Sequence, residues 1–260
     1  MVISRRAVLN GFGQSATLGA LAAALPTQLR AAEAASAAGA AAPAATYCLT
    51  RIYLPGADLS FDGDAFRNRH LPAMIKAYGK SAERIELRLP APVKEGAPPQ
   101  KIMATVNIWF HDVNGFLKQN TSAAKDLAAS MEKITKAPAA EQVDQVLTSL
   151  GDPRADVPVD CYCYSSYFPA KEGGTMDARY FAETFYPKFA AAYGNDAIRR
   201  IEVTSAATPK SLITGATHVY IRDEVAYDAA ASKSPELFAE LKPYTNIAPL
   251  QTLTKVYASG

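Results

Sequence analysis

The sequence has few of the residues that build metal sites and reactive thiol centres. Its 260 residues include three cysteines, three histidines and one tryptophan. No CxxC motif and no pair of histidines at zinc spacing occurs. A glycine-rich phosphate loop and a nucleophile elbow are also missing. These absences exclude the local signatures of zinc fingers, P-loop enzymes and α/β-hydrolases, and the sequence predicts no metal site.

The sequence also has little excess of one charge over the other. The formal net charge is +2, and residues 1–34 carry all of it through Arg5, Arg6 and Arg30 against Glu33. The remaining chain is formally neutral. A neutral body gives no electrostatic reason to bind nucleic acid or an anionic membrane surface. We therefore expect neither partner.

Residues 1–34 have the pattern of a targeting signal. Ser4-Arg5-Arg6 resembles the twin-arginine export motif, a short apolar stretch follows, and small residues around Glu33 suit a signal peptidase. The apolar stretch is too short for a stable membrane span. We expect cleavage near residue 34, an alanine-rich spacer over 35–45, and a periplasmic or secreted mature protein. In that oxidising setting, Cys48 could pair with Cys161 or Cys163.

A repeated pattern organises the mature chain. The segment Asp62–Gly79 matches Asp177–Gly194 in its aromatic residues, its proline and its final Ala-Tyr-Gly. Further matches lie on both sides in the same order. Upstream, Tyr53-Leu54-Pro55 recurs as Tyr167-Phe168-Pro169, and downstream Arg84-Ile85-Glu86-Leu87 recurs as Arg200-Ile201-Glu202-Val203. The pattern indicates a tandem duplication, with repeat 1 over 46–151 and repeat 2 over 152–260.

Each repeat has the order β-α-β-β-α-β, which is the ferredoxin-like arrangement. Alternating apolar residues predict the strands, and Asp62 and Asp177 are suitable helix N-caps. A four-stranded sheet with both helices on one face must bury its other face. We therefore predict an α+β protein in which the sheets of two repeats pack as a single-chain dimeric α/β barrel. The predicted strands are 47–54, 84–89, 102–110, 142–150, 160–168, 199–204, 212–221 and 250–257, and the predicted helices are 62–78, 113–134, 177–193 and 224–241.

The third strand of each repeat has two buried faces. Its aliphatic face suits packing beneath the helices. Its other face is aromatic with polar tips, which suits a ligand-lined barrel interior. That second face carries Asn107 and Trp109 in repeat 1 and His218 and Tyr220 in repeat 2.

The segment Phe66-Arg67-Asn68-Arg69-His70-Leu71-Pro72 resembles the signature of the EthD-like family of the dimeric α/β-barrel superfamily. Repeat 2 departs from this signature, because Phe185 occupies the position of the histidine. The superfamily includes cofactor-free enzymes such as muconolactone isomerase and polyketide cyclases or dehydratases, and also haem-binding branches. The resemblance implies the fold more strongly than a reaction.

His70 is the candidate catalytic residue, as a general acid or base on an inward helical stripe. The alternative is a core histidine that forms one hydrogen bond. His218 could act as an acid, a base or a haem ligand, or be a buried structural residue. Tyr164 could stack on a planar substrate, and Arg51 could meet a carboxylate. We expect Asn107, Trp109, His218, Tyr220, Arg51 and Tyr164 to bind substrate.

These features predict an exported, cofactor-independent enzyme that transfers protons as an isomerase, lyase or dehydratase. Its substrate would be a small, partly aromatic or lactone-like molecule. One alternative is a non-catalytic periplasmic protein that binds a small apolar or aromatic molecule. Another is a haem-binding barrel with His218 or His70 as the ligand. The assembly would be a monomeric pseudo-dimer or a homo-oligomer.

Overall fold

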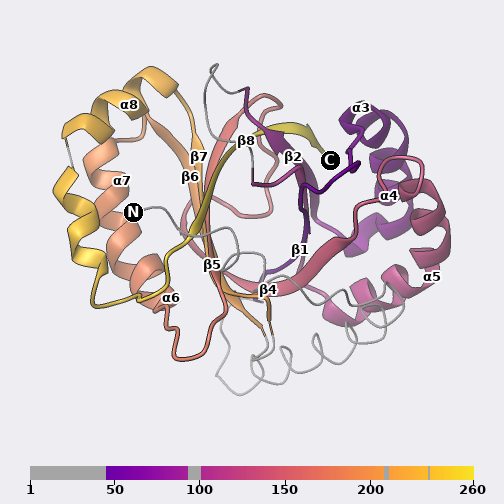
Figure 1. The fold of residues 1–260 in the computed structure, drawn as a ribbon, viewed down its shortest axis with the longest axis horizontal. Coiled ribbons are helices and arrows are strands. Elements are labelled where there is room, and N and C mark those ends of the chain that lie inside the picture. Colours follow the sequence, from indigo (N-terminus) through magenta and orange to yellow (C-terminus); the bar gives the residue numbers. More distant parts are fainter. Residues whose placement is uncertain (1–44, 93–100, 208–210, 234) are drawn as a thin grey trace.

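The computed structural model describes residues 45–92, 101–207, 211–233 and 235–260. The predicted signal peptide and most of the spacer lie outside these residues. The described chain forms two halves with the same order of elements around one barrel (Figure 1). The first half contains β1 (Tyr47–Tyr53), a helix made of α3 (Gly63–Ala65), η1 (Phe66–His70) and α4 (Leu71–Tyr78), the turn η2 (Gly79–Ser81), β2 (Arg84–Pro90), β3 (Ala104–Phe110), α5 (Val113–Met131) and β4 (Ala139–Leu150).

The second half repeats this order. It contains β5 (Tyr162–Pro169), a helix made of α6 (Ala178–Tyr180), η3 (Phe181–Phe185) and α7 (Tyr186–Tyr193), β6 (Ile198–Ala206), β7 (Ile213–Ile221), α8 (Glu224–Lys233), η4 (Pro235–Leu241) and β8 (Leu250–Ser259). The predicted helix 224–241 is therefore two helices, because a 3₁₀ helix begins at Pro235. The other predicted elements are present with ends that differ by a few residues.

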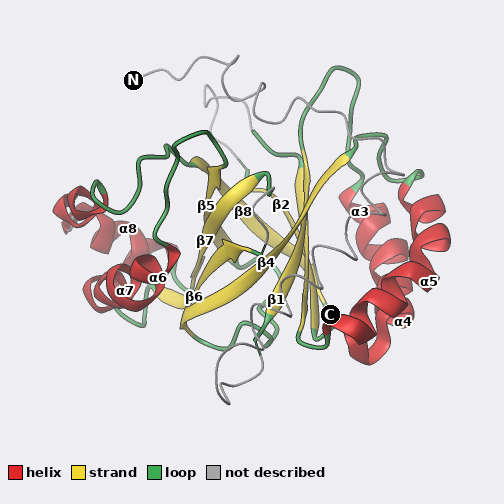
Figure 2. Cartoon of the chain, turned by 90° about the horizontal axis from the view of Figure 1, so that it is seen from below, coloured by secondary structure: helices red, strands yellow, loops and turns green. Residues whose placement is uncertain are grey.

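The eight strands close into one antiparallel barrel in the order β1-β3-β2-β8-β5-β7-β6-β4. Each half supplies four neighbouring strands. The seams are β2 with β8 and β4 with β6, so the second strand of each half pairs with the last strand of the other half. Helices cover the barrel on two opposite sides, one side for each half (Figure 2). The predicted α+β single-chain dimeric α/β barrel is confirmed.

Alternation along the strands separates an outer core from the barrel interior. In the first half, the outer core joins Leu49, Val106 and Ile108 of the sheet to Phe66 and Met74 of the helices. The second half has an equivalent core, in which sheet residues pack against the aromatic side chains of η3 and α7. The remaining strand residues face inward. The prediction that the aliphatic face of the third strands packs under the helices is correct.

Both long helices contain a π turn at the same place. The Leu71 N–H bonds to Phe66 O, and the Tyr186 N–H bonds to Phe181 O. A proline follows each turn, at positions 72 and 187, and has no N–H to continue the regular α-helical pattern. The sequence analysis predicted uninterrupted helices and missed this widening, which includes His70 in the first half and Phe185 in the second.

Strand register corrects one of the repeat matches. Tyr53 is opposite Ala104, and Phe168 is opposite Gly215. Tyr53 and Phe168 both belong to outer cores, whereas Tyr167 faces the barrel interior. The equivalent of Tyr53 is therefore Phe168, because a one-residue shift would move the side chain to the other face of the sheet.

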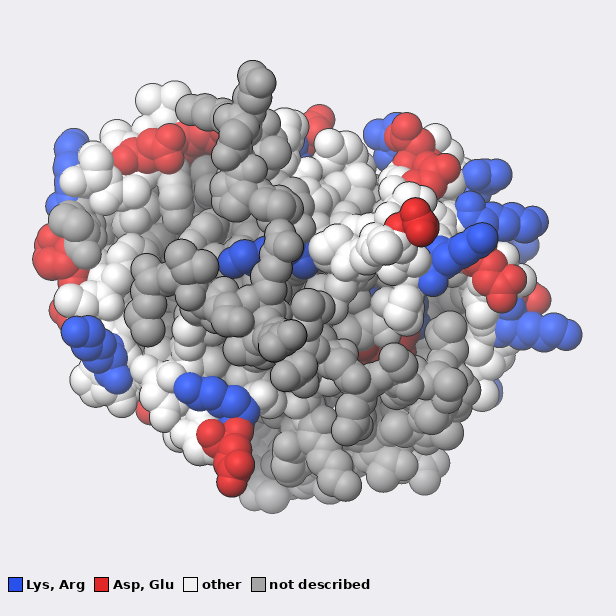
Figure 3. All heavy atoms as spheres, in the orientation of Figure 1, with Lys and Arg blue, Asp and Glu red and all other residues white. Residues whose placement is uncertain are grey.

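Two further features of the described residues are the length of the helices and the distribution of charge on the surface. None of the helices among the described residues is long and apolar enough to cross a bilayer. On the face shown in Figure 3, the cationic and anionic side chains of the described residues are interspersed. This mixture agrees with the small formal net charge of +2 of the sequence.

Candidate functional site

A network of charged side chains lies inside the barrel. Arg84 Nη2 donates to Glu202 Oε1 at 3.0 Å, and Arg200 Nη1 donates to the same oxygen at 3.3 Å. The Arg88 guanidinium bonds to the Glu86 carboxylate and to the Tyr220 hydroxyl. All of these side chains are 5% exposed or less. A buried charge network of this kind is stable only because its members pair with one another.

His218 and Trp109 belong to the same network. His218 Nδ1 lies 2.9 Å from Ser165 Oγ and 3.2 Å from Arg88 Nη1. Because a guanidinium can only donate, Nδ1 accepts and the ring proton is on Nε2. Burial and the nearby arginines lower the pKa of His218 well below its usual value. The Arg84 guanidinium lies over the Trp109 ring at 3.4 Å from its centroid.

The ends of the barrel are closed in different ways. Arg84 Nη1 and Arg200 Nη2 both donate to Ala155 O, at 3.0 and 2.7 Å, so the segment between the halves covers one end. An apolar cluster fills the other end and includes Ile52, Tyr167 and others. The predicted residues Asn107, Trp109, His218 and Tyr220 do face this interior and are 3% exposed or less.

The prediction of one shared pocket for these residues and His70 is wrong. His70 lies on the opposite face of the first-half sheet, under the helices, with its Nδ1 3.0 Å from Ser130 Oγ and its ring against Phe66. Burial, and to a lesser degree the charge of Arg51, lowers the pKa of His70 to about 4. The imidazole is therefore neutral near pH 7. Its place on the helix excludes it from the barrel interior because the helices pack outside the sheet.

Arg51 is on the same outer face as His70. Its Nε donates to Glu141 Oε1 at 2.7 Å, across the β1–β4 pair. Both side chains are mostly buried. The carboxylate that Arg51 meets is therefore part of the protein, and this ion pair occupies the space between the first-half sheet and its helices.

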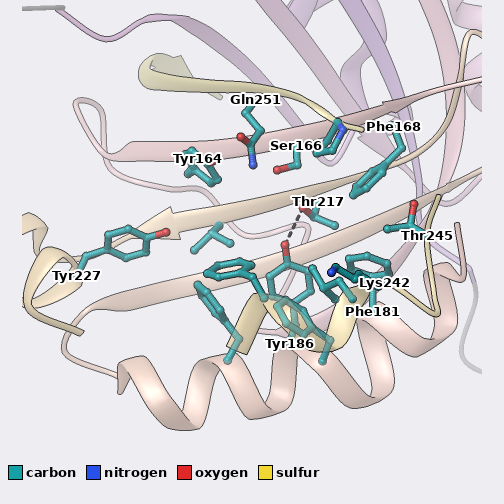
Figure 4. Close-up of a pocket in the computed structure, with 16 residues that line it drawn as sticks. Tyr164, Ser166, Phe168, Phe181, Tyr186, Thr217, Tyr227, Lys242, Thr245 and Gln251 are labelled. Atoms are coloured by element: carbon teal, nitrogen blue, oxygen red, sulfur yellow. Dashed lines mark hydrogen bonds between the residues drawn. The ribbon is translucent and has the colours of Figure 1, made fainter. Parts of the chain in front are cut away.

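The second half contains a cavity in the corresponding place. It has a volume of ≈ 230 Å³ and lies between the outer face of the second-half sheet and the helices η3, α7, α8 and η4 (Figure 4). Half of its lining residues are aromatic. The lining residues are Tyr164, Ser166, Phe168, Phe181, Phe185, Tyr186, Phe189, Thr217, Val219, Tyr227, Phe238, Leu241, Lys242, Thr245, Pro249 and Gln251.

Strand register explains why the cavity is in this half. Arg51 pairs with Val106 and Glu141, and the equivalent Ser166 pairs with Thr217 and Gln251. The long, ion-paired arginine of the first half is thus replaced by a short hydroxyl side chain. The carboxylate is replaced by a neutral amide. Both Ser166 and Gln251 line the cavity. The short serine leaves space where Arg51 lies in the first half, whereas Gln251 has the size of Glu141 and removes only its charge.

The polar groups of the cavity are hydroxyls, one amide and one lysine. Tyr186 OH donates to Thr217 Oγ1 at 2.7 Å. Burial raises the pKa values of Tyr164, Tyr186 and Tyr227 above the usual range. None of the lining residues is a histidine, aspartate or glutamate. The cavity therefore offers aromatic surface and hydrogen bonds, but no acid or base that titrates near neutral pH.

Of the predicted site residues, Tyr164 alone lines this cavity. Sequence analysis noted Phe185 only as the residue that replaces His70 in repeat 2. Phe181 and Phe189 lie four residues before and after it, on the same helical stripe. That aromatic stripe was the available signal. Ser166, Thr217, Lys242 and Gln251 carry no motif, and strand pairing was needed to bring them together.

The residues of the cavity do not fit a haem group. The lining contains no histidine or cysteine, and the volume is below the ~300 Å³ at which pockets for drug-sized ligands begin. The His218 side chain is already hydrogen-bonded within the barrel network, and His70 lies in the other half. Among the described residues, no cluster of three or more histidines, cysteines or carboxylates could hold a metal ion. The three cysteines are free, so the predicted pairing of Cys48 is absent from the structure.

Comparison with solved structures identifies the fold. A provisionally named monooxygenase from Fusobacterium nucleatum has a TM-score of 0.54 at 10% identity, covering 83% of this chain and 94% of its own. A provisionally named chlorite dismutase has a TM-score of 0.51 at 12% identity, covering 82% and 95%. An EthD-like protein from Ralstonia eutropha covers 38% of this chain and 89% of its own at 16% identity, with a TM-score of 0.35 that is too low to carry an argument.

No protein-family model and no curated protein matches the sequence. The identities to the solved structures are low, so the likeness concerns the fold alone. Within that limit, the chain has the architecture of the dimeric α/β-barrel proteins, with both halves of the barrel supplied by one polypeptide.

Proposed function

We propose that the protein binds a small, largely apolar aromatic molecule in the second-half cavity. The observation that supports this proposal is a cavity walled by aromatic side chains in one half, at the place where the other half has a buried ion pair. Aromatic walls favour planar ligands through stacked and edge-on contacts. Phe238 is 49% exposed and also lines the cavity, so the aromatic surface continues to solvent.

The volume indicates the size of the ligand. A cavity of about 150 Å³ in a protein core holds benzene, and pockets for drug-sized ligands begin near 300 Å³. The cavity of ≈ 230 Å³ lies between these values. A molecule with one ring or two fused rings fits this range.

The cavity supports binding more directly than proton transfer. It contains no side chain that could act as a general base near pH 7, and His70 is in the other half. The lowered pKa of His70 also makes it a weak base. We therefore favour a carrier or sensor of small molecules over the cofactor-independent isomerase, lyase or dehydratase predicted from the sequence.

Transplanting the first-half ion pair tests the proposal. The double variant S166R/Q251E should fill the cavity as Arg51 and Glu141 fill the first half. Wild-type protein should bind the neutral two-ring probe 2-naphthol in calorimetric titration, and the double variant should not. The variant T148R is the control, because Thr148 is exposed and does not line the cavity. Absence of 2-naphthol binding to wild type, or equal binding to the double variant, would contradict the proposal.

We propose in addition that the protein is exported to the periplasm or secreted by the twin-arginine route. The support is the Ser4-Arg5-Arg6 motif and the apolar stretch after it. The variant R5K/R6K should keep the full-length chain in the cytoplasm during cell fractionation. An unchanged distribution would contradict export by this route.

The tandem duplication is likewise an inference. It is supported by the same order of elements in both halves and by the 115-residue offset shared by Phe66 and Phe181 and by Tyr53 and Phe168. Half-length relatives that form homodimeric barrels would support it. Relatives with only one of the two halves attached to unrelated folds would argue against it.

A further inference from the structure

We propose that the ligand of the second-half cavity carries a carboxylate, which pairs with Lys242 at the mouth of the cavity. This inference rests on the proposed function and specifies the chemical class of the ligand as a small aromatic acid. Its starting point is the charge of the lining. Lys242 is the one charged residue among the sixteen that line the cavity.

The lysine is placed to meet a ligand and not another side chain. Figure 4 includes the Lys242 side chain among those that line the cavity. Within the described part of the chain, it has no hydrogen bond or ion pair. The neighbouring carboxylate of Glu240 is already held by Lys188 at 3.0 Å. The ammonium of Lys242 is therefore free to pair with an anion that enters the cavity.

The arrangement of polar and apolar surface favours one orientation of the ligand. Lys242 is exposed to solvent, whereas Phe185 and Phe189 are 2% exposed or less. A ring can thus lie in the apolar depth while a carboxylate remains at the wet mouth. That position avoids the large cost of moving an ionised group into a dry interior. A cationic ligand would have no partner, because no carboxylate lines the cavity.

The equivalent place in the first half has a different arrangement of charged side chains. There, Arg51 projects from the strand position equivalent to Ser166, and Glu141 neutralises it internally. In the second half the cation comes from the segment after η4 and has no internal carboxylate partner. At these equivalent places, Arg51 is neutralised by Glu141, whereas Lys242 keeps its charge available to a ligand of the cavity.

The experiment uses two ligands of the same shape, 2-naphthoate and its neutral isostere naphthalene-2-carboxamide. Calorimetric titration should show that wild-type protein binds the carboxylate about fivefold more tightly than the amide, the size expected for a partly exposed charge pair. The variant K242M should bind both ligands equally and keep the amide affinity of wild type. The control K255M removes a lysine that lies over the Tyr162 ring and outside the cavity, and should retain the preference.

The outcomes separate the inference from the proposed function. Equal wild-type affinity for the two ligands would overturn the role of Lys242 while leaving an aromatic binding cavity. A carboxylate preference that persists in K242M would overturn it too. If neither ligand binds wild type, both the inference and the proposed function fail. Added salt should weaken binding of the carboxylate and leave the amide unchanged, because only the first involves a partly exposed charge.

Discussion

Replacing His70 by phenylalanine, the residue at the equivalent position 185, should change how stability depends on pH. His70 is 1% exposed, and its pKa in the folded protein is lowered to about 4. In the unfolded chain the ring titrates near its ordinary value of about 6.5. Between these values the unfolded chain binds a proton that the folded protein does not, so lowering the pH favours unfolding.

The two pKa values fix the magnitude. The contribution of His70 to stability is fully present above pH 6.5 and decreases as the pH falls towards 4. At pH 5 the loss relative to pH 7 amounts to about 2 kcal/mol, and below pH 4 it approaches about 3 kcal/mol. His70→Phe removes this proton linkage. The difference in unfolding free energy between wild type and variant should therefore shift by about 2 kcal/mol in favour of the variant from pH 7 to pH 5.

Urea unfolding at pH 7, 6 and 5 measures this difference directly. Trp109 is the single tryptophan of the sequence and is buried in the barrel, so its fluorescence reports the loss of the interior. Other buried groups, such as His218 and Asp144, are present in both proteins, and their contributions cancel. A free-energy difference that stays constant within about 0.5 kcal/mol, the rough precision of such extrapolations, would refute the burial of a neutral His70.

Two further measurements test the interior of the barrel. Arg84→Met should destabilise the protein by about 3 kcal/mol, the lower end of the range for breaking a buried pair, because Glu202 loses its 3.0 Å partner and keeps only Arg200. Thermal unfolding should show the loss, and adding Glu202→Gln should restore part of it, whereas no recovery would argue against their pairing. Cys48 and Cys163 should resist a thiol reagent in the folded protein, since burial raises the pKa of each to about 12. Both thiols should react after denaturation without reductant, and fewer titratable thiols would show a disulfide that the structure does not contain.

The order of the elements was predictable because local signals agree with the final fold. Asp62 and Asp177 were predicted as N-caps, and each accepts the backbone N–H three residues later, at 2.8 and 2.9 Å. The alternation in the third strands also assigned Asn107 and His218 to the correct face. These signals depend on residues close in sequence, so they survive without knowledge of tertiary contacts.

The contents of the barrel were not predictable in the same way. Arginine and glutamate alternate with apolar residues in β2, a pattern that usually marks a solvent-facing strand. In the structure, Glu86 and Arg88 face inward, where side chains from β6 and β7 complete the network. A strand sequence contains no information on whether a partner strand from the other half will neutralise its charges. The sequence analysis predicted a ligand in this interior and missed the charge network for that reason.

The sequence analysis placed His70 on the wrong face of the sheet for a related reason. This error indicates how the two halves differ. Its helical stripe was correctly identified as inward, but "inward" from a covering helix means the outer face of the sheet and not the barrel interior. On that face, the first half fills the space with Arg51, Glu141 and a neutral imidazole, whereas the second half has Ser166, Gln251 and Phe185. Filling a space with an ion pair and opening it to an aromatic ligand are competing uses of one position. A chain that carries both halves can keep the first for packing and the second for binding, so we expect substitutions in the first-half ion pair to change stability before they change affinity.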